Sequence, residues 1–254
     1  TMLQEVSKTH AADATFNLGY IDYAEQRYDQ ALKAFASLQK DKTYAPLVPY
    51  YMGEICLLRE DYRKAEAVAT DYLKYYTGHK DEGEMHRIQG EARYGLQDYL
   101  DAATSLETYV LSTSSPQRKA LYKLGMSYYH AETFSKAVEA LGKVAVEQDA
   151  LSQNAYLHMG LAYLNLKERN QARMAFEQAS LGNHDMGVKE QALYNYALCI
   201  HETSYSPFAE SVHVFERFLN EFPTSSYAEK ANDYLIDVYM NTRSYEAALG
   251  SIDK

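Results

Sequence analysis

Residues 120–137 read Ala-Leu-Tyr-Lys-Leu-Gly-Met-Ser-Tyr-Tyr-His-Ala-Glu-Thr-Phe-Ser-Lys-Ala. The spacing within this stretch decides the fold. Gly125 is followed by Tyr128 after three residues, by Phe134 after nine and by Ala137 after twelve. Apolar residues recur at intervals of three and four, which predicts two amphipathic helices joined by a short turn. The glycine and the alanine are small enough to let the two helices cross closely.

The same pattern recurs along the chain, so the helix pair is a repeat. Glycines follow one another at intervals of 34, 37, 35 and 35 residues, at Gly19, Gly53, Gly90, Gly125 and Gly160. Twelve residues after them come Ala31, Ala65, Ala102, Ala137 and Ala172. Two more divergent units have Ala197 and Ile236 in the glycine position. One helix pair cannot bury its apolar face alone, so the units are predicted to stack.

The register predicts an all-α chain of about seven helix pairs in a single array over residues 1–254. The expected repeats lie near 11–43, 47–80, 84–114, 117–149, 152–184, 188–224 and 226–254. The expected helices span 11–24, 28–39, 47–58, 62–76, 84–96, 99–112, 117–130, 134–147, 152–165, 169–181, 188–202, 207–221, 226–241 and 245–254. The pattern stops at Lys254 within the last helix, so we expect a truncated repeat and a fragment of a longer chain.

Composition narrows the classes of partner. Apolar residues make up 46% of the 254 residues, the usual share for a globular core. The net charge of −10 disfavours nucleic acid and anionic membrane surfaces. The apolar run from Leu193 to Ile200 is too short to span a bilayer, so no membrane insertion is expected. Cys56 and Cys199 fit no metal or redox spacing and are expected to be buried.

The chain carries no motif of a known catalytic centre, so we expect neither an enzyme nor a cofactor. The densest polar cluster holds His79, Asp81, Glu82, Glu84 and His86. It could in principle bind a divalent metal, but its spacing matches no standard site. A solvated loop between repeats is therefore the preferred interpretation, and no metal site is predicted.

The small-residue pair, the aromatic residue that opens the second helix and the tyrosine after the glycine resemble the tetratricopeptide repeat. The resemblance covers about residues 11–254, although the family's tryptophan is replaced, with Tyr156 and Leu121 at two of its places. It implies a right-handed superhelical solenoid of antiparallel helix pairs that binds proteins. Pentatricopeptide arrays, which bind RNA, share the period but are typically basic.

In this family the first helix of each pair, helix A, lines a concave groove, and the second, helix B, lies outside. The resemblance implies a tyrosine-rich groove for a protein or extended peptide segment, because tyrosine combines contact area with a hydroxyl group. The predicted groove residues are Tyr20, Tyr23, Tyr50, Tyr51, Arg87, Tyr94, Tyr122, Tyr129, His158, Tyr194 and His201. The alternative is that many of these side chains only pack the helices together.

Chaperone-binding members of the family use a two-carboxylate clamp of Lys, Asn and Arg side chains. The matching places here hold Phe16, Asn17, Tyr51, Glu84 and Ile88, so the resemblance does not extend to that ligand.

Residues 215–228 resemble tetratricopeptide proteins of the bacterial cell envelope, including outer-membrane assembly lipoproteins. In this chain helix B ends in Phe222-Pro223, and Ser225-Ser226-Tyr227-Ala228 follows. In those proteins, too, helix B ends in an aromatic residue and proline, and Ser-x-Tyr-Ala leads into the next helix A. This implies a periplasmic or outer-membrane-associated scaffold, with a cytoplasmic adaptor as the alternative. Other functions left open are a structural spacer, self-association into a homo-oligomer through terminal repeats, and a regulatory domain of a larger protein.

Overall fold

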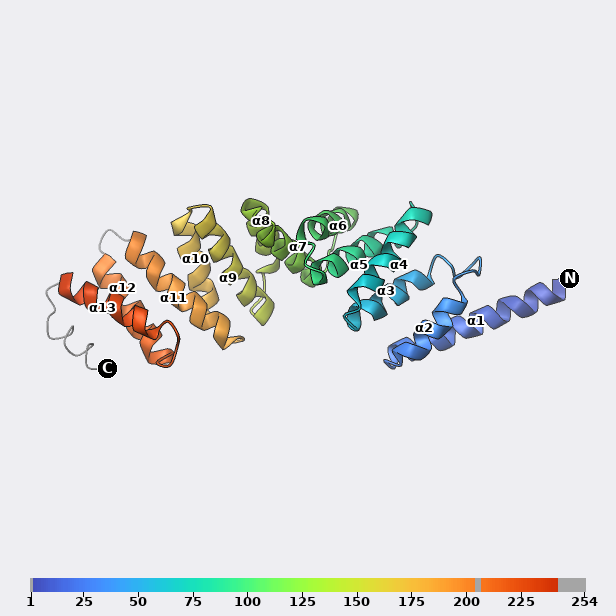
Figure 1. The fold of residues 1–254 in the computed structure, drawn as a ribbon, viewed down its shortest axis with the longest axis horizontal. Coiled ribbons are helices and arrows are strands. Elements are labelled where there is room, and N and C mark those ends of the chain that lie inside the picture. Colours follow the sequence, from blue (N-terminus) through green and yellow to red (C-terminus); the bar gives the residue numbers. More distant parts are fainter. Residues whose placement is uncertain (1, 204–206, 242–254) are drawn as a thin grey trace. The chain divides into compact units, whose positions relative to one another are not determined.

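The computed structural model describes residues 2–203 and 207–241, and over these ranges the chain forms thirteen α-helices and no strand. Contacts divide the chain into two units, residues 1–127 and 128–254, with the boundary inside α7 (Arg118–His130). Each unit is built from consecutive helices that pack on one another (Figure 1). The all-α fold predicted from the repeat pattern is confirmed.

Unit 1 contains six complete helices and the first part of α7. They are α1 (Met2–Ala24), α2 (Tyr28–Ser37), α3 (Val48–Leu58), α4 (Tyr62–Tyr75), α5 (Glu82–Gly95) and α6 (Tyr99–Ser112). Partners in a pair run antiparallel: Gly83 near the start of α5 lies against Ser112 at the end of α6, whereas Gly90 lies against Leu106.

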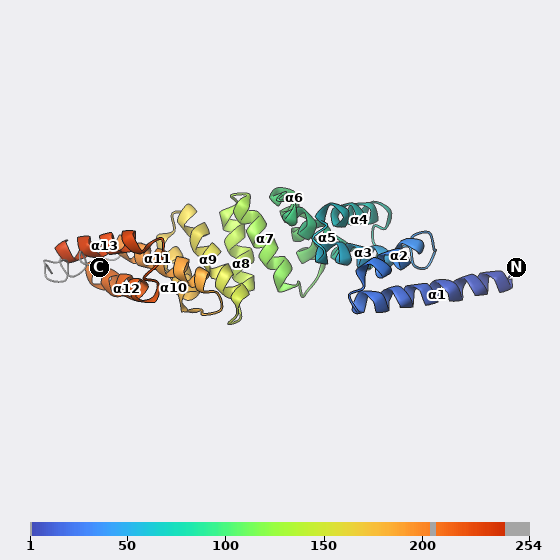
Figure 2. The ribbon, with the colours of Figure 1, turned by 60° about the horizontal axis from the view of Figure 1, so that its bottom comes forward.

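Unit 2 contains the end of α7 and six further helices, seen from a second direction in Figure 2. They are α8 (Phe134–Val144), α9 (Ala150–Asn165), α10 (Arg169–Leu181), α11 (Met186–Thr203), α12 (Pro207–Glu221) and α13 (Ala228–Asn241). The predicted helix limits agree with the structure within three residues, except that α1 begins at residue 2 and not at 11. The expected helix 245–254 lies outside the described residues.

The repeated glycines lie where helix A crosses helix B. A Cβ atom on Gly90 would stand 2.6 Å from Leu106 Cγ, and one on Gly160 would stand 2.5 Å from Phe176 Cε1. Leu106 and Phe176 both follow their glycine by sixteen residues. No side chain fits between such partners, so glycine is what permits their contact.

In repeat 2 (residues 47–80) a different residue fills the space over the glycine. Its position sixteen after the glycine is the small Ala69, and Ile88 from the next helix A fills the space over Gly53. A Cβ on Gly53 would stand 2.9 Å from Ile88 Cγ2. The five repeated alanines of helix B are all completely buried.

The turn from helix A to helix B has the same backbone in five repeats. In the third repeat the N–H of Asp98 donates to Arg93 O at 2.9 Å and that of Gln97 donates to Tyr94 O at 3.0 Å, a Schellman motif. The residue between the helices is left-handed with φ between 56° and 64° at Gln26, Glu60, Gln97, Glu132 and Lys167. None of these is glycine, although the left-handed region costs other residues about 1–2 kcal/mol.

Replacing Gly90 by alanine is expected to destabilise the fold. Crowding against Leu106 should cost roughly 1–3 kcal/mol, and the better helix propensity of alanine offsets only part of this. Gly142→Ala is the control, since a Cβ at this exposed position of α8 meets nothing closer than Met159 Cε at 4.0 Å. It should stabilise by about 0.5–1 kcal/mol. Urea unfolding followed by circular dichroism measures both, and equal midpoints for the two variants would contradict the packing account.

Replacing Gln97 by glycine is expected to stabilise the fold by about 0.5–1 kcal/mol, because glycine adopts the left-handed conformation without a steric cost. Gln97→Val should destabilise it, since a β-branched residue fits this region worst. Thermal unfolding measures the midpoint temperatures of both variants and the wild type, which should fall in the order Gln97→Gly, wild type, Gln97→Val. A Gln97→Val variant as stable as wild type would show that the turn is not held left-handed.

Candidate functional site

Helix A side chains of unit 1 form one connected surface, which we call the A-helix face. Its contacts run from helix to helix: Tyr23 meets Tyr51 at 5.7 Å between ring centroids, and Lys123 reaches Glu91. The face comprises Tyr20, Tyr23, Tyr50, Tyr51, Glu54, Arg87, Glu91, Tyr94, Tyr122 and Lys123, carried by α1, α3, α5 and α7. The face includes the seven predicted groove residues of unit 1, and their role in binding stays a prediction.

Tyr51 is the centre of an aromatic cluster at one end of this face. Its ring stacks on the buried Phe35 at 5.2 Å and meets Phe16, Tyr23 and Tyr20 edge-on at 5.7–5.8 Å. These contacts join α1, α2 and α3, so Tyr51 packs the helices together. Tyr20 lies on the outside of the cluster with 49% of its surface exposed, which leaves it accessible to a partner.

Arg87 is the centre of an ion network in the middle of the face. Only 4% of its surface is exposed. The guanidinium donates to Glu84 at 2.6 Å, to Glu91 at 3.0 Å and to Glu54 on the neighbouring α3. Lys123 Nζ on α7 donates to the other oxygen of Glu91 at 2.6 Å. The predicted site residue Arg87 thus links three helices through its carboxylate partners.

The network shifts the pKa values around it. Burial favours the neutral form of Glu91, but Lys123 and Arg87 outweigh burial and lower the pKa of its carboxyl group. Burial first, and then the charge of Glu54, raise the pKa of Tyr50 to about 12. The Tyr50 hydroxyl is therefore neutral at physiological pH and can both donate and accept a hydrogen bond.

Tyr94 and Tyr122 form a second, half-buried aromatic part of the face. Tyr94 meets Tyr99 edge-on at 5.8 Å, at the point where α5 turns into α6. Burial, together with the neighbouring Tyr94, raises the pKa of Tyr122 to about 12. Both rings present a neutral hydroxyl beside partly exposed aromatic surface.

All four predicted groove residues of unit 2 meet the rings of other residues. Tyr129 meets His158 edge-on at 5.6 Å, and His158 Nδ1 donates to Asn154 O at 2.9 Å. His201 lies edge-on to Tyr234 at 5.5 Å. Tyr194 is buried and stacks on Tyr227 at 4.6 Å. Tyr194 thus packs α11 onto the segment before α13. The other three residues, Tyr129, His158 and His201, are half-buried.

The polar cluster around His79 and the two cysteines were the other candidate sites in the sequence. In the described ranges no group of three His, Cys, Asp or Glu side chains is placed to hold a metal ion. Glu82 accepts from Gly78 N at 2.7 Å, and Glu84 is a partner of Arg87. Both cysteines are buried, and burial raises the pKa of Cys199 to about 11. No helix in the described part of the chain is both long and apolar enough to cross a bilayer.

Glu54, Glu91 and Lys123 lie at groove positions of the repeat register but were not among the eleven selected groove residues, and they complete the network. A signal for them is present in the sequence. Glu54 and Glu91 directly follow repeat glycines, and Lys123 precedes one by two residues. Alternating charges at groove positions of successive helices A indicate ion pairs between them.

Comparison with known proteins agrees with the fold. Sequence profiles of the tetratricopeptide repeat match residues 57–117, 89–155 and 154–180. A search of curated proteins finds no sequence match. The C-terminal part of a TPR repeat-containing protein from Cytophaga hutchinsonii is 15% identical with a TM-score of 0.66, over 93% of this chain and 92% of that chain.

Two further solved structures are similar. YrrB, described as a TPR protein with an unusual peptide-binding site, is 15% identical with a TM-score of 0.64, over 79% of this chain and 98% of that chain. A tetratricopeptide repeat protein from Parabacteroides merdae is 13% identical with a TM-score of 0.56, over 96% of this chain and 91% of that chain. At these identities the likeness shows the fold, an all-α solenoid of helix pairs.

Replacing Glu91 by glutamine is expected to reduce the loss of unfolding free energy that occurs at acidic pH. The native pKa of Glu91 lies below its ordinary value of 4.5, so the unfolded chain binds the proton more readily. Wild-type stability should therefore fall as the pH drops from about 4.5 through the native pKa, and this fall should be smaller in the variant.

Urea unfolding from neutral pH to about pH 3 measures this difference. Glu139→Gln is the matched control, because Glu139 is an exposed carboxylate paired with Lys143 on α8. Its profile should follow that of the wild type. A Glu91→Gln profile that also superimposes on the wild type would show that the network does not stabilise the fold.

Proposed function

We propose that this chain, which is a tetratricopeptide-repeat protein, is a non-catalytic scaffold that binds an extended segment of another protein on the A-helix face. The observation that carries the proposal is the face itself. Four helices of unit 1 contribute to one connected surface, and tyrosines make up six of its ten side chains. Partly exposed rings with neutral hydroxyls suit a segment that offers both apolar side chains and backbone hydrogen-bonding groups.

The ion network supports this proposal by holding the face in shape. Arg87 bridges α3 and α5, and Glu91 with Lys123 bridges α5 and α7. A surface that is already ordered loses less conformational entropy when a partner binds. Each charged group of the network has an oppositely charged partner, although the three carboxylates outnumber Arg87 and Lys123 by one, so affinity should come mainly from the tyrosines. The peptide-binding site named for YrrB is an analogy for a ligand of this kind on the same fold.

A second candidate function, association with a further helix, is favoured by the outer side of α1. Ile21 lies two residues after its repeat glycine and is exposed. The equivalent Ile55, Ala92 and Val238 are completely buried by neighbouring helices. A self-associating chain would cover Ile21, and Ile21→Lys should then abolish a concentration-dependent increase of mass in analytical ultracentrifugation. A wild type that stays monomeric at all concentrations would exclude this function.

We further propose a cell-envelope location, which rests on the resemblance of residues 215–228. The structure gives this stretch a packing role: Tyr227 N donates to Ser225 Oγ at 3.0 Å, and the Tyr227 ring stacks on Tyr194. Fractionation of source cells with an antibody against this chain tests the location. Recovery with periplasm or outer membrane would support it, and recovery with cytosol would support the adaptor alternative.

Tyr20 is expected to cross-link to the partner when it is replaced by a photoreactive phenylalanine analogue. Leu100 is the matched control, since it is exposed on α6, a helix B of the same unit. A partner captured from position 20 but not from position 100 supports the A-helix face. Tyr20→Ala should then weaken binding of that partner about tenfold while the chain stays folded, as judged by circular dichroism. Capture from position 100 alone would move the site to the helix B side.

A further inference from the structure

Glu54 lies beside two tyrosines of the A-helix face. It follows Tyr50 by one helical turn on α3. Burial is the largest cause of the raised pKa values of Tyr50 and of Tyr23 on α1, and the charge of Glu54 is the second. Arg87 lowers both pKa values by less than Glu54 raises them. The charges around the two hydroxyl groups therefore sum to a negative potential.

The ion network leaves carboxylate oxygens available in this part of the face. Arg87 donates to Oε1 of Glu54 and to Oε2 of Glu84. In the described part of the chain, the second oxygen of each of these carboxylates accepts no hydrogen bond. The side chains of Glu54 and Glu84 are 17% and 34% exposed, so both keep contact with solvent. One guanidinium is thus shared among three carboxylates, and Lys123 reaches only Glu91.

Free basic side chains are missing from the neighbouring stretches of helix A. Residues 10–24 of α1 contain no lysine or arginine, and neither does α3. Helix α5 contains two arginines, one of which is the centre of the network. The other, Arg93, lies towards helix B, where it donates to Glu66 on α4 and to Ser105 on α6. Every cation in these stretches is already paired, so charge complementarity selects a basic ligand.

We propose that the segment bound on the A-helix face carries a lysine or arginine side chain that is held by Glu54, an inference that rests on the proposed function. The cationic group donates to the oxygen of Glu54 that Arg87 leaves free. The rings of Tyr23 and Tyr50 flank it, because a cation is attracted to the face of an aromatic ring. An acidic residue at the same place would be repelled by Glu54 and Glu84 and would find no unpaired cation.

Three peptides with blocked ends test this charge preference. All three alternate leucine and serine, and they differ only in the central residue, which is lysine, glutamine or glutamate. Fluorescence anisotropy of the labelled peptides at about 0.15 M salt measures their affinities. The lysine peptide should bind the wild-type chain about tenfold more tightly than the glutamine peptide, and the glutamate peptide should bind most weakly. Equal affinities of the lysine and glutamine peptides, or no binding of the lysine peptide, would overturn the proposal.

Two glutamine variants locate the preference. Glu54→Gln should remove most of the tenfold preference for lysine over glutamine. Glu66→Gln is the matched control and should keep it. Glu66 also pairs with an arginine of α5, but it lies on a helix B, and both variants lose one negative charge. A preference that survives Glu54→Gln, or that Glu66→Gln reduces as much, would overturn the proposal. Circular dichroism checks that both variants fold, and the comparison of peptides on the wild type depends on neither.

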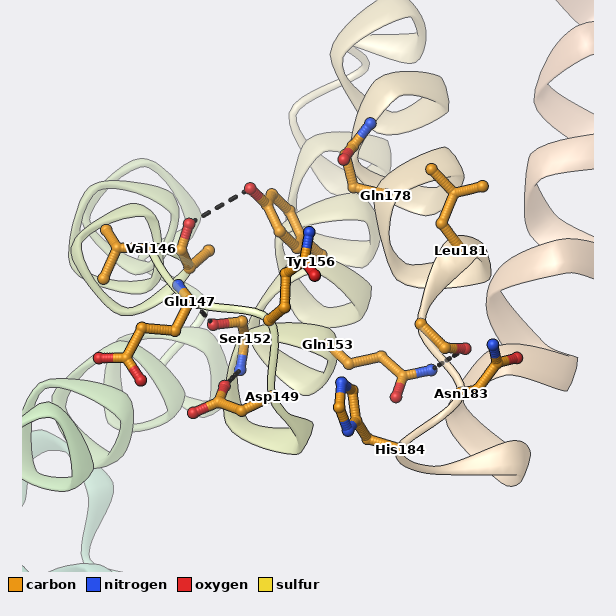
Figure 3. A pocket seen from close by; sticks show the side chains of 13 residues that line it. Val146, Glu147, Asp149, Ser152, Gln153, Tyr156, Gln178, Leu181, Asn183 and His184 are labelled. Atoms are coloured by element: carbon orange, nitrogen blue, oxygen red, sulfur yellow. Dashed lines mark hydrogen bonds between the residues drawn. The ribbon is translucent and has the colours of Figure 1, made fainter.

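A hollow of about 600 Å³ in unit 2 provides a control for binding at another place. It lies between residues 145–149 and 182–184, and Figure 3 shows Val146 and Leu181 on opposite sides of it. Leu181 is 58% exposed. Leu181→Ser should leave the affinity for the lysine peptide unchanged. A loss of affinity would place the peptide in this hollow and would overturn the proposal.

Tyr20→Ala separates failure of this inference from failure of the proposed function. It should weaken all three peptides about tenfold, because Tyr20 offers exposed contact area on the same face. If it does so while the lysine and glutamine peptides bind equally, the face binds a segment and the basic residue is wrong. If it changes none of the affinities, binding on the A-helix face is itself wrong.

Discussion

Close contact between a glycine of helix A and a large side chain sixteen residues later in helix B sets the geometry of a repeat. Leu106 lies on Gly90 and Phe176 on Gly160 in this way. Because the two helices touch on this side, the opposite side of helix A remains for neighbouring helices A and for solvent. Repeat 2 shows that volume matters more than residue identity, since Ile88 of the next repeat compensates for Ala69 over Gly53. The A-helix face follows from this packing.

The A-helix face combines two kinds of interaction with different roles. Arg87 and most of its carboxylate partners are largely removed from water, so desolvation offsets much of their attraction, whereas loss of one partner would leave a buried charge uncompensated. Tyr51 has a similar packing role through the Phe16 and Phe35 rings. In the proposed function, exposed or half-buried tyrosines, Tyr20 above all, supply contact area on a surface that is already ordered. The sequence pattern of a groove therefore includes residues that pack the helices and residues that are available to a partner.

Much of the fold could be predicted because glycine, alanine and aromatic positions repeat with nearly constant spacing. Helix limits followed from the same register. The left-handed turn at Gln97 could not be predicted, since the residue is not glycine and the conformation is imposed by the backbone hydrogen bonds of the turn. The position in the repeat could not show that Tyr20 is exposed whereas Tyr194 is buried. Exposure depends on neighbours that are distant in the sequence, such as Tyr227, which stacks on Tyr194. The hollow between residues 145–149 and 182–184 could not be predicted, because it depends on the buried Gln153 amide and on the course of two loops.

Hydrogen exchange of the chain with and without a partner segment bound tests the central claim most directly, because it reports every helix at once. The account predicts slower exchange in α1, α3 and α5, with the helix B amides of α2, α4 and α6 unchanged. Protection confined to α2, α4 and α6, or to the outer side of the terminal helices, would contradict binding on the A-helix face.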